Sequence, residues 1–291
     1  MFRFVERERA SYPVTTLCRV LSVSPSGFWA WRGRRQSARA TADAGLAERI
    51  RAIHRASRGT YGAPRVHAEL SAAGVHCGRK RVARLMRLAG LTGVHRRRHA
   101  RRPAGTANTV SPPDLVQRDF SASGPDELWV ADITYLPTDA GFLYLAVLID
   151  AWSRLVVGWS MAAHLRTELI TGALEMALGR RPPSDKLVHH SDRGTQYTSL
   201  AFGQCLAKAG IAASVGSVGD AYDNALAESF FASLETELID RSSWPTRGAA
   251  KLAVFEYIEV FYNRQRRHSA LEYLSPLEFE RRYRPETTPA A

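Results

Sequence analysis

The chain has 291 residues and a net charge of +12, and hydrophobic residues make up 45% of it. This composition is typical of a folded globular protein and excludes a disordered chain, and the longest apolar run, near residues 142–149, is far shorter than the ~20 residues that span a bilayer. The first ten residues are charged throughout and resemble no signal peptide, so the sequence predicts a cytoplasmic protein without a membrane partner.

The charge is divided unevenly along the chain. Residues 1–108 hold 23 Lys and Arg and 5 Asp and Glu, a net charge of +18, whereas residues 109–291 hold 17 and 23, a net charge of −6. A basic half joined to a mildly acidic half is typical of a nucleic-acid binder attached to a second unit. Basic surfaces also bind acidic proteins and membranes, so charge alone leaves those partners open.

Residues 1–42 are predicted to form an N-terminal helical segment, in which Ser24-Pro25-Ser26-Gly27 indicates a turn. Residues 43–98 are predicted to form an all-α unit. Pro64 can begin one of its helices and Gly74 can end it, and a further helix is expected from about Arg79 to Leu88, where apolar residues recur at i, i+3, i+4 and i+7.

Two short helices, the second of them basic, are typical of a helix-turn-helix, although a solvated basic helix on a bundle fits the pattern equally well. The arginines that continue through residues 96–102 favour DNA, because so many uncompensated charges repel one another without a polyanion. The candidate DNA-contact residues are Arg65, Arg79, Lys80, Arg81, Arg84, Arg87, Arg96, Arg97, Arg98, Arg101 and Arg102.

A linker rich in Pro and Gly is predicted over residues 99–124, and the pattern then changes to strands. Short turns predict an antiparallel meander of the first three strands. Strands are expected at 128–135, 142–149, 155–160, 187–190 and 211–215, and helices at 167–178, 199–209, 223–239, 248–262 and 276–282. This order predicts an α/β, ribonuclease-H-like core with a mixed five-stranded sheet over residues 125–241, and a C-terminal helical extension over 242–291.

Two aspartates lie on neighbouring parts of the predicted sheet. Asp132 is inside the first strand, where Asp is disfavoured and a buried carboxylate is costly unless it is paired or binds metal. Asp192 follows the fourth strand, and sites collect at the carboxyl ends of strands. Taken singly, an exposed strand Asp and an ordinary turn Asp are alternatives, and His189 and His190 are expected to pack beside the site rather than to bind metal.

Glu228 lies on the long helix, beside its apolar stripe, where a surface glutamate is the alternative interpretation. Three carboxylates from three elements can hold Mg²⁺ together with substrate phosphates. Two such ions, ~4 Å apart, can activate the attacking oxygen and stabilise the leaving oxygen of an in-line phosphoryl displacement. The set of Asp132, Asp192 and Glu228 is therefore the candidate catalytic and metal-binding site.

These motifs resemble a known family. Asp192 and Glu228 are separated by 35 residues, the spacing of DDE recombinases. Residues 61–66, 129–135, 190–197, 223–231 and 262–271 resemble the transposases of the insertion-sequence-three family, a bacterial group related to retroviral integrases. The resemblance extends over residues 20–283.

The resemblance implies a DNA transposase that cuts the ends of its element and joins them to target DNA (DNA integration and recombination). It implies that Asp132, Asp192 and Glu228 hold two Mg²⁺ ions, with Mn²⁺ as an alternative ion. It further implies a homo-oligomer on DNA, a nucleoid-associated location, and an upstream-frame partner protein that is separate or fused by frameshifting.

Two positions depart from the family pattern. Glu235 stands where a basic residue is usual, so a DNA contact is made elsewhere, for instance by Arg241 or Lys251, or activity is impaired. Glu272 stands where Gly is common. The alternatives to a transposase are a catalytically impaired DNA-binding regulator and a ribonuclease-H-like nuclease that cuts without joining, and the carboxylates alone do not separate these functions.

Overall fold

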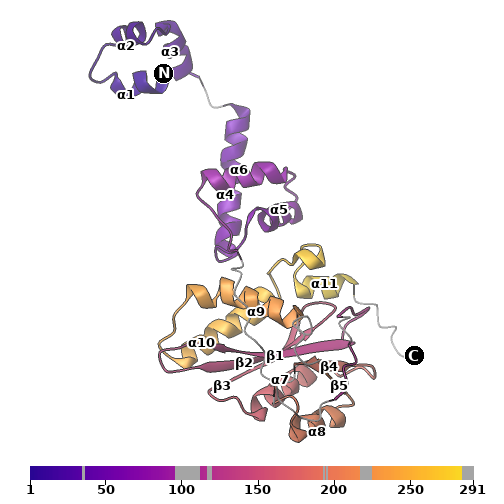
Figure 1. Ribbon diagram of the computed structural model, residues 1–291. Coiled ribbons are helices and arrows are strands. Elements are labelled where there is room, and N and C mark those ends of the chain that lie inside the picture. The colour runs from indigo at the N-terminus through magenta and orange to yellow at the C-terminus, as the bar shows by residue number, and fades with distance from the viewer. Residues whose placement is uncertain are drawn as a thin grey trace.

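The computed structural model describes residues 1–34, 37–95, 112–116, 120–192, 194, 196–216 and 225–283. The N-terminal helices form two groups that project from a larger α/β core (Figure 1). The first group comprises α1 (Phe2–Glu8), α2 (Val14–Val20) and α3 (Pro25–Arg32), and the second comprises α4 (Ala38–Ala56), α5 (Ala63–Ala72) and α6 (Arg79–Leu88).

The predicted turn at residues 24–27 is the beginning of α3, and that prediction was wrong. Ser24 caps the helix, because its Oγ accepts a hydrogen bond from the Gly27 N–H at 3.2 Å, and Pro25 occupies the first helical position. A serine followed by proline is as favourable at a helix start as in a turn. The predicted boundary between residues 42 and 43 falls inside α4, whose cap is Ser37.

The core contains a mixed five-stranded sheet with the strand order β3-β2-β1-β4-β5. β1 pairs antiparallel with β2 and parallel with β4, so β1 lies at the centre of the sheet. The strands are β1 (Leu128–Leu136), β2 (Leu143–Asp150), β3 (Val156–Ala162), β4 (Val188–Ser191) and β5 (Ala212–Val215). The fold class predicted from the order of elements is confirmed, and every strand lies within two residues of its predicted bounds.

Helices cover both faces of the sheet (Figure 1). On one face, α7 (Thr167–Arg180) and α8 (Leu200–Lys208) pack against alternate residues of β1 and β2, such as Trp129 and Leu148. Gly158 on β3 permits this approach, because a Cβ there would lie 2.2 Å from a carbonyl oxygen of α7.

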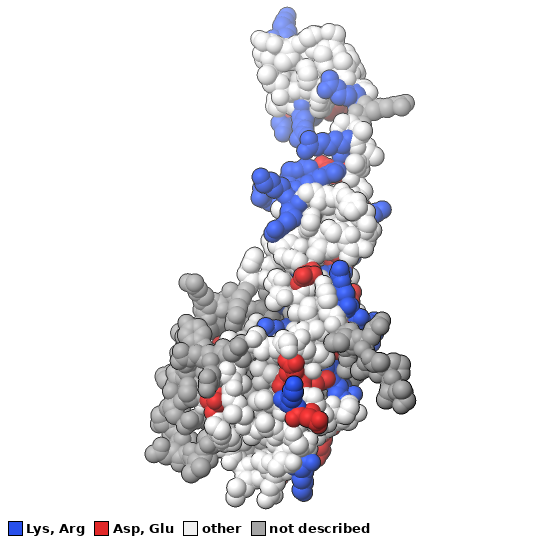
Figure 2. Space-filling view, turned by 90° about the vertical axis from the view of Figure 1, so that its right-hand side faces the viewer, with Lys and Arg blue, Asp and Glu red and all other residues white. Residues whose placement is uncertain are grey.

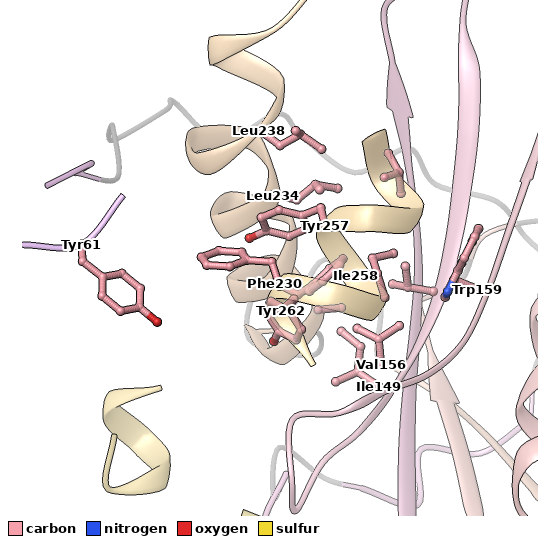
Figure 3. Packing of buried hydrophobic residues seen from close by; sticks show 14 of the residues in the cluster. Tyr61, Ile149, Val156, Trp159, Phe230, Leu234, Leu238, Tyr257, Ile258 and Tyr262 are labelled. Carbon is pink, nitrogen blue, oxygen red and sulfur yellow. The ribbon is translucent and has the colours of Figure 1, made fainter. Parts of the chain in front are cut away.

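The opposite face is covered by α9 (Ala225–Glu237) and by residues that follow it in the chain. α10 (Arg247–Phe255) continues into a π-helical segment, η2 (Glu256–Tyr262), and Figure 3 shows Tyr257 and Ile258 from η2 packed between α9 and the sheet. The predicted C-terminal extension thus shares the hydrophobic core of the sheet. Short 3₁₀ segments, η1 (Ile239–Arg241) and η3 (Ser269–Leu271), precede α10 and the final helix, α11 (Pro276–Tyr283).

The turn after η3 has a backbone conformation that favours glycine at position 272. Glu272 has φ 52° and ψ 31°, in the left-handed region, and Tyr273 follows with φ 62°. A residue with a Cβ in this region is strained by about 1–2 kcal/mol, and glycine relieves this strain. Part of the gain is offset because glycine gives the unfolded chain more conformational freedom. We expect Glu272→Gly to raise the free energy of unfolding by about 0.5–1 kcal/mol in urea denaturation.

Tyr283→Phe is the control for that substitution, because the Tyr283 hydroxyl donates to Glu272 Oε2 at 2.9 Å and this bond is lost with Glu272. The bond is exposed, so its loss should change stability little. A lower stability of Glu272→Gly would show that backbone strain at this turn is not the dominant effect.

Candidate active site and nucleic-acid interface

Asp132 and Asp192 are brought together by the register of two parallel strands. Ala131 on β1 pairs with Ser191, the last residue of β4, so Asp132 within β1 and Asp192 directly after β4 lie side by side. Asp132 is half-buried, and its Oδ1 accepts a hydrogen bond from the Ile133 N–H at 2.7 Å. Asp192 is exposed, and its Oδ1 accepts from the Gly194 N–H at 3.0 Å.

Glu228, the third candidate carboxylate, lies on a helix that packs against the sheet. It lies in the first turn of α9 with its side chain exposed, while Leu226, Ala227 and Phe230 point into the core. α9 packs across β1 and β2, which carries Glu228 toward Asp132. The three carboxylates predicted from sequence therefore come from three separate elements. Asp132 and Asp192 line one cleft, whereas Glu228 is not among the described residues that line it.

The pKa of Asp132 reflects its burial and the two other carboxylates. Burial raises the pKa of the Asp132 carboxyl to about 8, and the charges of Asp192 and, more weakly, Glu228 act in the same direction. The hydrogen bond from Ile133 partly opposes the rise. Like charges raise a carboxyl pKa when they lie nearby, and Asp192 has a larger effect on Asp132 than Glu228 has.

The aspartates open onto a cleft of about 270 Å³. Among the described residues, those lining it include no Lys or Arg. The lining residues are Asp132, Ile133, Thr134, Tyr135, Tyr144, Leu165, Asp192, Gly194, Gln196 and Tyr197. A hollow with converging carboxylates and no compensating cation suits a positively charged ligand together with an anionic substrate.

Tyr197 is a lining residue that the sequence interpretation missed. Its hydroxyl is buried and has no hydrogen-bond partner among the described residues. Burial raises the pKa of Tyr197, and the charges of Asp132 and Asp192 raise it further. The sequence could have indicated this role, because Tyr197 follows Asp192 by only five residues and the turn after Asp192 brings the chain back to the cleft.

The two histidines before Asp192 lie inside the protein. Burial lowers the pKa of His189 to about 3, and its ring packs against Tyr197 and Phe202 with centroids 5.9 and 5.1 Å apart. His190 Nδ1 lies 2.9 Å from Ser214 Oγ on β5. Both contacts are packing or hydrogen-bonding roles beside the site, as the sequence analysis expected.

Lys and Arg side chains gather over the α4–α6 unit (Figure 2). Arg79, Lys80 and Arg87 of α6 are exposed, and among the described residues none of them forms an ion pair. Arg81 and Arg84 both hydrogen-bond to Asp43 of α4, at 2.6–2.7 Å, and these bonds lower the pKa of Asp43. One carboxylate does not neutralise this helix, so α6 presents a basic surface. The predicted arginines at 96–98 and 101–102 lie outside the described residues.

Arg65 has a different position from the other candidate DNA contacts. Its Nε donates to the Arg267 carbonyl oxygen at 2.9 Å, and its guanidinium lies 3.6 Å from Glu237. Burial lowers the pKa of Arg65. The structure thus engages Arg65 in the contact between α5 and the C-terminal part of the core rather than on the surface of α6, a distinction that its position in a basic helical unit could not reveal.

The structure also shows where Glu235 and the two basic residues named as substitutes for a DNA contact lie. Glu235 is half-buried on α9, and the two proposed substitutes, Arg241 and Lys251, are both exposed. Arg241 reaches toward the α4–α6 unit, because its Nη2 lies 3.3 Å from the place where a Cβ of Gly59 would be. Of the two, Arg241 is the one that lies near the basic unit.

Comparisons with known families match the helical unit and the core separately. Family models described as an integrase core domain match residues 122–221 and 228–283, and a model described as an HTH-like domain matches residues 41–99. No described helix is both long and apolar enough to cross a membrane.

Two curated relatives are similar over nearly their whole length. The transposase for insertion sequence element IS629 of Shigella sonnei is 38% identical over 288 residues, which are 97% of this chain and 96% of the relative. Transposase InsF for insertion sequence IS3A of Escherichia coli is 40% identical over 279 residues, 95% of this chain and 97% of the relative.

Solved structures give more distant matches. A simian T-cell lymphotropic virus intasome in complex with PP2A regulatory subunit B56 gamma matches with a TM-score of 0.47 and 17% identity over 77% of this chain and 73% of that chain. The HTLV-2 integrase catalytic core domain in complex with magnesium matches with a TM-score of 0.41 and 17% identity over 57% of this chain and 100% of that chain.

Proposed function

Because the chain belongs to the insertion-sequence-three family of DNA transposases, we propose that Asp132, Asp192 and Glu228 are the catalytic carboxylates of this DDE polynucleotidyl transferase. The observation that carries the assignment is that Asp132, from β1, and Asp192, directly after β4, line one cleft. Burial raises the pKa of Asp132, and the charges of Asp192 and, more weakly, of Glu228 on α9 raise it further. The pairing of Ala131 on β1 with Ser191 on β4, the residues directly before Asp132 and Asp192, supports this assignment.

The donor set fits a hard divalent cation, since the cleft collects carboxylates and no described lining residue is a Lys or Arg. When bound, two Mg²⁺ ions, or Mn²⁺ in their place, would stabilise the charge on the attacking and leaving oxygens of phosphoryl transfer. Among the described residues, no three His, Cys, Asp or Glu side chains already surround one point. We therefore expect metal and DNA binding to draw the carboxylates closer.

The remaining assignments follow from the same function. Residues 43–98 would bind the element ends, with α6 and the arginines at 96–102 holding phosphate, and residues 125–241 would carry the chemistry. Joining two ends requires two active sites, which favours a homo-oligomer on DNA, and an upstream-frame partner would add end recognition. A chromosomal substrate in a bacterial cell favours a cytoplasmic, nucleoid-associated location.

A strand-cleavage and strand-transfer assay tests the proposal. It uses a labelled duplex carrying the element end, with Mg²⁺, and compares the wild type with Asp192→Asn and with Asp139→Asn, a matched change at an exposed aspartate outside the cleft. Metal-dependent cutting and joining should fall at least a thousandfold in Asp192→Asn and persist in Asp139→Asn, because a lost metal ligand removes the main stabilisation of the transition state.

Other outcomes would overturn the assignment. Binding without chemistry, even with Mn²⁺ and the partner protein, would indicate a DNA-binding regulator and would point to Glu235. Cutting without joining would indicate a nuclease. Full activity of Asp192→Asn would remove Asp192 from the catalytic set.

A further inference from the structure

The first three helices form a unit with its own small core. Val5 of α1, Cys18 of α2 and Phe28 of α3 are fully buried against one another. Among the described residues, the side-chain hydrogen bonds, ion pairs and ring contacts of residues 1–34 stay within this unit, and it stands apart from the remaining helices (Figure 1). None of the three family models reaches it, since the first begins at residue 41.

The connection between α2 and α3 has the form of a helix-turn-helix. Only residues 21–24 separate the two helices. The turn is tight, because Ser22 adopts a left-handed φ of 52° and the Val23 N–H donates to the Cys18 carbonyl at 2.9 Å. α1 braces the pair closely at Gly27, where a Cβ would lie 3.3 Å from the Phe2 ring. In such an arrangement the second helix is the one that enters the major groove of DNA.

The outer face of α3 is free to make that contact. Ser26, Trp29, Ala30 and Gly33 follow the i, i+3, i+4, i+7 spacing of one helix face and are all exposed, whereas Phe28 on another face is buried. Small residues at positions 26 and 30 permit close approach to a groove. The Arg32 guanidinium lies 5.3 Å from the Trp29 ring centroid, so this bulky side chain is paired with a cation.

The charge of the unit suits phosphate. Residues 1–34 contain six arginines and two glutamates, a net charge of +4. The two glutamates are engaged by arginines of the same unit, with Glu6 within 3.4 Å of Arg9 and Arg32, and Glu8 within 2.8 Å of Arg7. Arg19 on α2 and Arg34 after α3 are exposed. An excess of arginine around a protruding helix attracts the DNA backbone without sequence preference.

We propose that residues 2–34 are a second DNA-binding helix-turn-helix, which places α3 in the major groove of the element end beside the segment bound by α4–α6. The identity of the DNA as an element end rests on the proposed function, whereas the duplex-binding role rests on the unit itself. The 19 residues of α4, which rise roughly 28 Å, lead from one unit into the other. That length is comparable with one turn of DNA, about 34 Å, so the chain would contact two adjacent segments.

Footprinting with the full chain tests this second contact. A labelled duplex carrying the element end is bound by the Asp192→Asn protein, which keeps the DNA intact, and by its Ser26→Asp and Ala30→Glu derivatives. Ser26→Asp is a stringent variant, because an acidic residue in the first turn of a helix favours the helix while it repels phosphate. Ala10→Glu repeats the Ala-to-Glu change at an exposed position outside α3.

We expect protection of two adjacent segments in the parent protein and in Ala10→Glu. Ser26→Asp and Ala30→Glu should lose one segment and bind about tenfold more weakly, while Lys80→Glu on α6 should weaken protection of the other. Binding is carried out in EDTA, where metal-dependent cleavage cannot occur, so a failure of the catalytic assignment leaves this readout intact. An unchanged footprint in both α3 variants would overturn the proposal. Variants that keep the footprint but lose self-association would also overturn it, because α3 would then be a protein-docking surface.

Discussion

Replacing Asp132 by asparagine is expected to abolish DNA cleavage while making the metal-free protein more stable. Asp132 is half-buried beside two other carboxylates, and its pKa is raised to about 8, first by burial and then by Asp192 and Glu228. A charge in such a place destabilises the fold unless a cation compensates it. Asparagine keeps the shape and the acceptor for the Ile133 N–H and removes the charge.

The stability difference between the wild type and Asp132→Asn should depend on pH. The folded pKa lies above the unfolded value of 3.8, so the unfolded chain releases its proton first and the wild type loses stability as pH rises from about 4 to about 8. Near pH 7 we expect Asp132→Asn to unfold with a free energy higher by on the order of 2 kcal/mol, and near pH 4 the two proteins should coincide.

Urea denaturation in EDTA at several pH values measures the effect, with Asp139→Asn as the matched control. In excess Mg²⁺ the order should reverse, because the wild type gains binding energy that the variant lacks. A variant that is less stable than the wild type in EDTA at pH 7 would mean that Asp132 has a structural partner, and the site assignment would lose its electrostatic support.

The sequence was sufficient for the parts of the fold whose signals are local. Alternation and turn residues predicted the three antiparallel strands, and apolar spacing predicted α6 at its observed bounds, Arg79–Leu88. Sequence also singled out two of the candidate carboxylates, because Asp132 violates the preferences of a strand interior and Asp192 follows a strand. The two aspartates lie side by side because Ala131 pairs with Ser191, 60 residues later in the chain. No local sequence pattern predicts this pairing.

Sequence reasoning had least to say about residues whose contacts are with a distant partner. Arg65 has the charge of a DNA contact, yet its guanidinium contacts the Arg267 carbonyl, 202 residues away along the chain, and Glu237 on α9. The 242–262 region shows only helical periodicity, which does not tell a separate extension from a layer of the core. Tertiary contacts decided both, and periodicity reports only which face of a helix is apolar.

Those distant contacts form a buried network that joins α9 to the C-terminal segment and the α4–α6 unit. Arg266 donates to both oxygens of Glu237, at 2.8 and 2.7 Å, and to Ser233 Oγ at 3.1 Å. The Tyr257 hydroxyl donates to Glu237 at 3.0 Å. Glu237 and Arg266 are 8% and 5% exposed, so water cannot replace a missing partner. Glu237 and Glu228 share α9, so this network also fixes the helix of the proposed site.

The adjacent contacts extend the network to the DNA-binding unit. The Tyr61 hydroxyl accepts from the Arg267 N–H at 2.8 Å and donates to the Gln265 carbonyl at 3.1 Å. Arg267 in turn donates to both oxygens of Glu69 on α5, at 2.8 and 3.0 Å. The residues on either side of Arg266 therefore hold α5 and the segment that precedes it, while Arg266 itself holds α9.

Truncation of either member of the central pair is therefore expected to be strongly destabilising. Glu237→Ala or Arg266→Ala leaves a buried, uncompensated charge, and we expect each to lower the free energy of unfolding by about 3–5 kcal/mol in urea denaturation. Arg51→Ala, which breaks an exposed pair with Glu48 on α4, should cost no more than about 1 kcal/mol.

The double variant Glu237→Leu/Arg266→Met distinguishes the ion pair from the packing around it. Because an apolar pair of similar volume removes both charges together, it should recover most of the stability that either truncation loses. If this ion pair couples the DNA-binding unit to the catalytic core, the double variant should still bind the element end. It should cleave that end more slowly, because Arg65 loses its contact with Glu237. If the loss of stability in the double variant instead equals the sum of the losses in the two single variants, the two charges act independently. Coupling between DNA binding and catalysis would then rest on the Tyr61 and Arg267 contacts alone.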